Sequence, residues 1–201
     1  MDKQTFLNRF LFHNPQSPSN LESFTRPFKQ DVTSLKKAAV LLPLVKRPHG
    51  LNLILTERAL HLKHHPGQVS FPGGKYEHTD PNLQHTALRE TEEEIGILRN
   101  KVSIFGSLPR LPTVSGFVIS PFLGFVDTDH TTLIDYQEVR SVFEVPLEFL
   151  LNHNNFHQQH LIVNQKRYFT YCIPYKNKFI WGVTAQILKN LQRHLSTSLD
   201  H

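Results

Sequence analysis

The stretch Arg89-Glu90-Thr91-Glu92-Glu93-Glu94-Ile95-Gly96-Ile97 places four glutamates within five residues and ends near a glycine. On a helix, at about 100° per residue, Glu90, Glu93 and Glu94 share one face, whereas Glu92 points to the opposite side. Like charges at this spacing destabilise a helix by roughly 0.2–0.5 kcal/mol per pair, so something must offset their repulsion. A divalent cation would do so, and oxygen-only ligands favour Mg²⁺ or Mn²⁺ over zinc. These residues alone leave an alternative to a metal site open. The glutamates could form a solvated helix face, with the neighbouring arginine as counter-charge.

The helix that carries the glutamates has sequence signals at both ends. Asp80 is a typical N-cap residue, Pro81 suits the first helical position, and Gly96 is a typical stop. One side of the helix is less polar and carries Leu88, Thr91 and Ile95. We therefore expect the helix to pack on a sheet, with its carboxylates at the border of an open cleft.

Apolar runs on both sides of this helix predict strands. Residues 37–46 and 52–58 flank a Pro-His-Gly turn and are expected to form a hairpin. Further strands are expected at residues 102–108, 117–126, 141–145, 167–173 and 178–181. Helices are expected at residues 4–12 and 184–194, and a mobile polar loop at 152–160. This alternation predicts a mixed α/β fold.

The chain has 201 residues, which suits one domain. A Pro- and Ser-rich stretch follows the first helix and is typical of a linker. We therefore divide the chain into residues 1–33, a helix and linker, and a domain at residues 34–201.

Composition narrows the class of protein. Hydrophobic residues make up 39% of the chain and charged residues 19%, which excludes disordered, collagen-like and coiled-coil classes. The single cysteine, Cys172, has no partner for an internal disulfide, and the first twenty residues lack the apolar core of a secretory signal. A cytoplasmic location is therefore expected, and no apolar run is long enough to predict a membrane span.

The charge balance indicates an anionic partner. The formal net charge is +5 and the sequence pI is about 9.4. Because the basic residues are scattered singly and in pairs, a small polyphosphate is a better fit than a nucleic acid.

Residues 74–97 or so resemble the Nudix box of the nucleoside-diphosphate-linked-moiety hydrolases. The resemblance rests on Gly74, on the short loop with Glu77 and Asp80, and on the run of glutamates. The general pattern has its glycine fourteen residues before the arginine, whereas Gly74 stands fifteen before Arg89. The loop is thus one residue longer. Such a loop is similar to that of the coenzyme A pyrophosphatase branch of the family.

That branch also carries an earlier motif of the form LLTxR(S/A)x3Rx3Gx3FPGG. This chain reads LILTERA at residues 53–59, then Lys63, Gly67 and Phe71-Pro72-Gly73-Gly74. Lys63 stands where the motif has its second arginine, so the charge is kept but the forked donor geometry of arginine is lost. Segments at residues 138–147 and 179–185 also resemble that branch, so the resemblance covers nearly the whole chain.

The resemblance implies a Nudix fold, an α/β/α sandwich around a mixed β-sheet. It also implies a Mg²⁺- or Mn²⁺-dependent enzyme that hydrolyses the diphosphate of coenzyme A and its derivatives. The products would be 3′,5′-ADP and 4′-phosphopantetheine, or the acylated phosphopantetheine. Two alternatives stay open: a Nudix pyrophosphatase acting on NADH or ADP-ribose, and a non-catalytic nucleotide-binding module. A monomer and a homodimer are equally compatible with the sequence.

The candidate metal ligands are Glu90 and Glu94, one helical turn apart, with Glu93 as a further ligand or as the general base. The roles of these three glutamates are interchangeable at this level. The resemblance implies that Arg89 orients a glutamate of the box. Four further carboxylates are candidates for completing the metal shell or acting as base: Glu77, Asp80, Glu138 and Glu144.

Four residues are candidates for binding the substrate. Arg58 and Lys63 carry positive charge that suits its phosphates. Gly73 and Gly74 permit close backbone approach in the turn before the helix.

Overall fold

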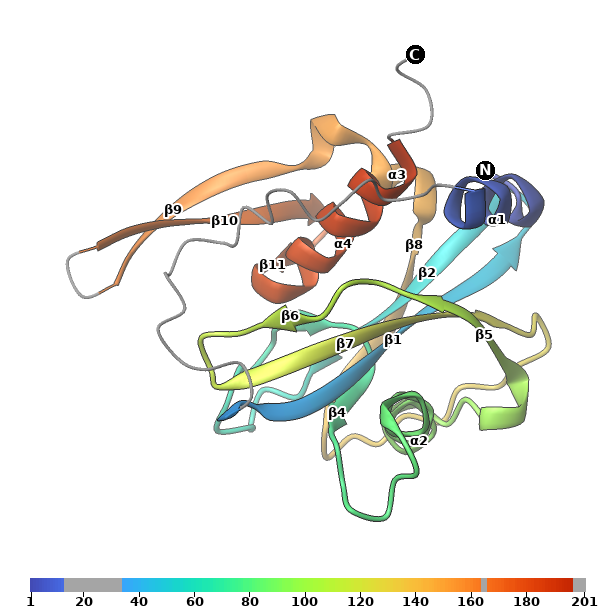
Figure 1. Ribbon diagram of the computed structural model, residues 1–201, viewed down its shortest axis with the longest axis horizontal. Helices are drawn as coiled ribbons and strands as arrows, with labels where there is room; N and C mark the ends of the chain where they lie inside the picture. The colour runs from blue at the N-terminus through green and yellow to red at the C-terminus, as the bar shows by residue number, and fades with distance from the viewer. Residues whose placement is uncertain (13–33, 164–165, 197–201) are drawn as a thin grey trace.

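The computed structural model describes residues 1–12, 34–163 and 166–196 (Figure 1). Most of the predicted linker lies outside these ranges.

A mixed sheet of eight strands forms the centre of the described structure. Its strands are β1 Lys36–Arg47, β2 Gly50–Arg58, β3 Val69–Ser70, β4 Gly73–Lys75, β5 Val102–Ser107, β6 Leu111–Pro112, β7 Phe117–Val126 and β8 Val139–Pro146. The order is β3-β2-β1-β7-β5, with β4 paired to β1, β6 to β7 and β8 to β2. β1 and β7 are parallel, whereas the other strand pairs are antiparallel. The predicted hairpin is confirmed, because β1 and β2 pair up to Arg47 and Gly50 around a two-residue turn.

A second sheet and the helices complete the fold. The sheet has the order β11-β10-β9 and comprises β9 His157–Val163, β10 Lys166–Tyr175 and β11 Lys178–Trp181. The α-helices are α1 Lys3–Phe12, α2 Leu83–Ile95, α3 Leu147–Leu151 and α4 Gly182–Ser196, and single 3-10 turns occur at η2 Arg99–Lys101 and η3 His153–Asn155. Among the described residues, no helix is long and apolar enough to cross a membrane.

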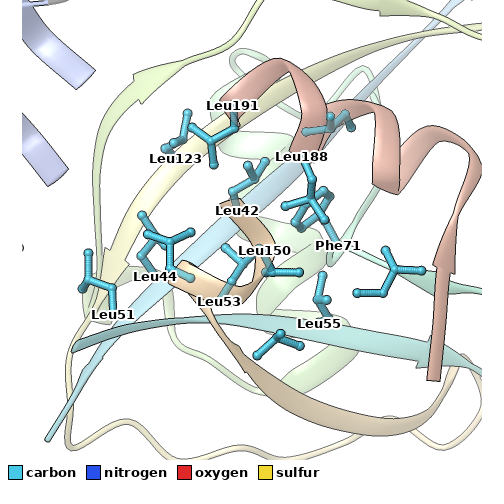
Figure 2. Close-up of a cluster of buried hydrophobic side chains, with 14 of the residues drawn as sticks. Leu42, Leu44, Leu51, Leu53, Leu55, Phe71, Leu123, Leu150, Leu188 and Leu191 are labelled. Atoms are coloured by element: carbon cyan, nitrogen blue, oxygen red, sulfur yellow. The ribbon is translucent and has the colours of Figure 1, made fainter. Parts of the chain in front are cut away.

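Helices cover both faces of the main sheet, with α2 on one face and α1, α3 and α4 on the other (Figure 1). The alternation of side chains along β1 explains this arrangement. Ala39 and Leu41 pack against Ala87 of α2. On the other face, Leu42 packs with Leu188 and the rest of a leucine-rich core beneath α4 (Figure 2). The predicted α/β class with a mixed sheet is confirmed.

The first helix contributes to this core. Phe6 and Phe10 of α1 are buried, and each meets the ring of Phe105 edge-on. A Cβ atom at Gly106 would overlap the Phe10 ring, so the glycine in β5 leaves room for that side chain. Helix α1 is thus packed on the main sheet.

The predicted end of α2 is confirmed, but its predicted start is wrong. Gly96 has φ 72° and donates its N–H to the carbonyl of Glu92, as a left-handed C-terminal cap does. At the other end, Asn82 is the N-cap and its side chain accepts a hydrogen bond from the N–H of His85 at 2.9 Å. Asp80 and Pro81 precede the helix, because the carboxylate of Asp80 is held by other donors.

The predicted polar loop at residues 152–160 is also wrong. This segment contains η3 and the start of β9, which pairs with β10 from His157 opposite Cys172 onwards. β9 is the edge strand of its sheet, and residues 157–160 are exposed. Polar side chains on such an exposed edge give a sequence that looks like a loop.

Candidate active site

The glycine turn before the box packs directly against the glutamate helix. Gly73 donates its N–H to Oε2 of Glu94 at 3.2 Å. A Cβ atom at Gly74 would overlap the carboxyl group of Glu90, and one at Gly73 would overlap the carbonyl oxygen of Ala39. Gly73 also has φ 151°, a conformation that side chains disfavour. The turn and the helix are therefore one unit, which needs both glycines for close approach.

Arg89 holds two glutamates of the box. Its Nη1 donates to Oε2 of Glu93 at 2.8 Å, and its Nη2 donates to Oε1 of Glu90 at 3.0 Å. Nη2 also donates to the carbonyl oxygen of Lys75 at 3.1 Å, which ties the helix to β4. The side chain is only 11% exposed. This geometry fits the role that the resemblance implies for Arg89.

Asp80 anchors Arg89 from the other side. Nε and Nη2 of Arg89 donate to its two carboxylate oxygens at 3.0 and 3.1 Å. Thr86 donates its hydroxyl at 2.9 Å and Glu77 its backbone N–H at 3.1 Å. Above all, the Arg89 guanidinium holds the pKa of this buried carboxyl well below its usual range. Asp80 is thus fully engaged in fixing Arg89, which also explains why it does not cap the helix.

Glu94 is buried and Glu90 is partly buried, and positive charge around the two carboxylates does not offset this burial. Burial raises the pKa of Glu94 to about 8; the N–H of Gly73 opposes this shift, while Glu90 and Glu138 add to it. Burial likewise raises the pKa of Glu90, and Arg89 only partly opposes it. A cation placed between such groups would relieve both the desolvation and the mutual repulsion.

The donor set fits a divalent ion held by few protein ligands. Among the residues that the structure describes, no three His, Cys, Asp or Glu side chains gather into a ready-made metal site. Glu93 is 56% exposed, whereas Glu90 is 15% exposed and Glu94 is buried, so Glu90 and Glu94 form the inward pair. Magnesium is commonly bound by one or two carboxylates, with water and substrate phosphate completing its octahedron. The pair therefore suffices for such an ion.

The structure places the two basic candidates differently. Arg58 lies at the end of β2, half-buried, and its charge acts on Glu94. Lys63 is exposed on the loop between β2 and β3. Of the remaining carboxylates, Glu138 lies close enough to raise the pKa of both Glu90 and Glu94. Glu144 instead accepts hydrogen bonds from Arg47 and Asn52.

Sequence reasoning missed the role of Glu57, the neighbour of Arg58. Its buried carboxylate accepts hydrogen bonds from Lys178 at 2.7 Å and from Ser141 at 2.9 Å. Burial opposes ionisation, but these hydrogen bonds lower its pKa overall. Because Lys178 belongs to β11, the bond ties the second sheet to the strand that carries Arg58. Nothing in the local sequence signals a contact between residues so far apart.

Comparison with known proteins decides the family. The NUDIX domain model matches residues 35–163. A Nudix hydrolase named NudL from Yersinia pestis (strain Pestoides F) is 38% identical over 191 residues, which cover 95% of this chain and 94% of the relative. NudL from Yersinia pseudotuberculosis serotype O:1b (strain IP 31758) gives the same values. The chain belongs to the Nudix hydrolase family.

Solved Nudix structures share the fold. A MutT/nudix family protein from Enterococcus faecalis matches with a TM-score of 0.51 at 15% identity, over 96% of this chain and 74% of that one. DR0079 from Deinococcus radiodurans matches with a TM-score of 0.50 at 13% identity, over 77% of this chain and 81% of that one. The predictions of a Nudix hydrolase and of a pyrophosphatase enzyme are confirmed. Nudix hydrolases use divalent metal ions, in keeping with the carboxylate pair described above.

The raised pKa of Glu94 predicts how the stability of the metal-free Nudix hydrolase depends on pH. The folded state holds this proton up to about pH 8, whereas a glutamate in the unfolded chain has its ordinary pKa of 4.5. The contribution of this group is therefore fully present below pH 4.5 and is lost as pH rises towards 8. The slope is at most about 1.4 kcal/mol per pH unit.

Urea unfolding in a chelator between pH 5.5 and 8.5 would measure this slope. Glu94→Gln should flatten it, whereas Glu92→Gln, on the opposite side of the helix, should leave it unchanged. Equal slopes in the wild type and Glu94→Gln would contradict the assignment.

Proposed function

We propose that this Nudix hydrolase cleaves the diphosphate of coenzyme A and its derivatives, with Mg²⁺ or Mn²⁺ as cofactor. The products are 3′,5′-ADP and 4′-phosphopantetheine, or acyl-phosphopantetheine. The proposal rests on one observation: the LTERA and FPGG motif contacts or acts on the glutamates of the Nudix box. The LTERA and FPGG segments, which resemble the coenzyme A pyrophosphatase branch, contain Arg58 and Gly73, and both of these residues act on Glu94 of the Nudix box.

The chain's own residues provide the frame for a diphosphate. Glu90 and Glu94 supply the oxygen ligands on the inward side of α2. Arg58, at the end of β2, supplies a positive charge beside them for a phosphate oxygen. The glycine turn brings the backbone of β4 close to the carboxylates, so a substrate lying along it is held next to the pair. Lys63, on its exposed loop, is the second basic residue that we propose to bind the substrate's phosphates.

A divalent ion held by this pair would offset the negative charge that develops on the diphosphate and orient the attacking water. In the reaction, water adds to one phosphorus, the bridging P–O bond breaks, and the water loses one proton to a base. We assign that proton to one of the three box glutamates. Glu93 is the most accessible of them, and Arg89 fixes its position at 2.8 Å. We therefore favour Glu93 as the general base, with Glu90 and Glu94 as ligands.

A substrate panel tests the proposal. We expect kcat/KM for coenzyme A and acyl-coenzyme A to exceed that for NADH, ADP-ribose and dinucleoside polyphosphates by at least about tenfold, a difference of about 1.4 kcal/mol in transition-state binding. Each reaction would be run with Mg²⁺, with Mn²⁺ and with a chelator. Preference for a substrate that lacks pantetheine would refute the coenzyme A assignment but keep the enzyme class. Binding without turnover of any substrate would favour a nucleotide-binding module.

A further inference from the structure

A cleft of about 420 Å³ lies on the α2 face of the main sheet, beside the first turn of α2. Its size is typical of small-molecule sites. The apolar part of its lining is Leu35, Leu83, Pro112 and Val118. None of the described residues that line it is acidic. Neither the box glutamates nor the FPGG turn contributes to it.

Strand register explains why these side chains meet. Lys37 pairs with Val118 and Ala39 with Ser120, so Lys37, Val118 and Ser120 all lie on the face that α2 covers. Pro112 of β6 pairs with Val118 and closes one side. Leu83, which forms one wall of the cleft, precedes Glu90 by seven residues on α2. The two residues are therefore about 10 Å apart along the helix axis. The cleft is therefore separate from the carboxylate pair.

One polar group in the cleft has no hydrogen-bond partner within the described part of the chain. Ser120 is only 5% exposed, and its Oγ has no hydrogen-bond partner among the described residues. A buried hydroxyl without a partner destabilises the protein, so such groups call for an explanation in function. A ligand oxygen in the cleft would supply the missing bond.

The two cations of the lining are also available. Lys37 and Arg110 are exposed, and neither forms an ion pair with any residue that the structure describes. Nζ of Lys37 lies 5.9 Å from the ring centroid of Tyr76, a contact that leaves its ammonium hydrogens free to donate to an anion. A guanidinium and an ammonium in the lining of one cleft match the oxygens of a phosphate, and the apolar walls match the organic body attached to it.

We propose that this cleft is a second ligand site, which binds a small organic phosphomonoester. Its phosphate lies between Lys37 and Arg110, its body lies against Leu83 and Val118, and one of its oxygens meets Ser120. The site is independent of the diphosphate site and does not rest on the coenzyme A assignment.

Calorimetric titration of the full chain with AMP, in a chelator so that no divalent ion takes part, tests the proposal. Adenosine and inorganic phosphate serve as the two partial probes, and both should bind at least about tenfold more weakly than AMP. Lys37→Gln and Arg110→Gln should each weaken AMP binding about tenfold or more, because each removes a charge-assisted hydrogen bond. Lys36→Gln, the exposed neighbour on the opposite face of β1, is the matched control and should change nothing.

Two further variants separate this site from folding effects and from the diphosphate site. Ser120→Ala should weaken AMP binding several-fold without lowering the urea midpoint, since its hydroxyl loses no hydrogen bond to any described residue. Glu94→Gln should leave AMP binding unchanged. The proposal is overturned if AMP fails to bind at up to about 10 mM, if binding survives Lys37→Gln and Arg110→Gln together, or if Glu94→Gln abolishes it.

Discussion

Replacing Glu94 by glutamine should lower kcat about 10³-fold, because removal of a metal ligand forfeits several kcal/mol of transition-state charge stabilisation. Glutamine keeps the size of the side chain and still accepts the hydrogen bond from Gly73, so the fold should persist. Steady-state kinetics at saturating Mg²⁺ measure the loss. Circular dichroism and a urea midpoint at pH 8 establish that the variant is folded.

The matched control is Glu92→Gln on the same helix. Glu92 pairs with Arg99 and lies away from the carboxylate pair, so its kcat should stay within about threefold of the wild type. An active Glu94→Gln enzyme, or an equal loss in Glu92→Gln, would remove Glu94 from the metal site.

Replacing the two glycines of the FPGG turn by alanine should affect different properties: stability for Gly73 and activity for Gly74. Gly73→Ala should destabilise the protein by about 3 kcal/mol or more, because the new Cβ atom overlaps the carbonyl of Ala39 and φ is positive. Gly74→Ala should cost less than about 1.5 kcal/mol, since its Cβ atom meets only the movable end of Glu90. By displacing that carboxylate, Gly74→Ala should instead lower kcat at least about tenfold.

Urea denaturation and kinetics on both variants check this contrast. A stable Gly73→Ala protein, or a fully active Gly74→Ala enzyme, would contradict the packing of the turn on the helix.

The elements of the fold that depend on local pattern were predictable from sequence. Strand β7 and the end of α2 at Gly96 coincide with their predictions, because an apolar run and a glycine stop are local signals. The start of α2 was misplaced since Asp80 suits an N-cap equally well. Only the tertiary contact with Arg89 shows that its carboxylate is already engaged.

The sequence predicted which residues form the candidate site better than it predicted how their side chains are arranged. Helical spacing grouped Glu90, Glu93 and Glu94, but it carried no information on Arg89, which donates to both Glu93 and Glu90. It also did not show that Glu93 is exposed while Glu94 is buried. Glu138 comes to this region because the distant segments β2 and β8 pair beside it. No periodicity in the sequence encodes such pairing, whereas the family resemblance had already placed the box.

The most direct test is mass identification of the products from coenzyme A incubated with the enzyme and Mg²⁺ or Mn²⁺. We predict equal amounts of 3′,5′-ADP and 4′-phosphopantetheine, with neither formed in a chelator. Intact coenzyme A alongside hydrolysed NADH or ADP-ribose would contradict the account.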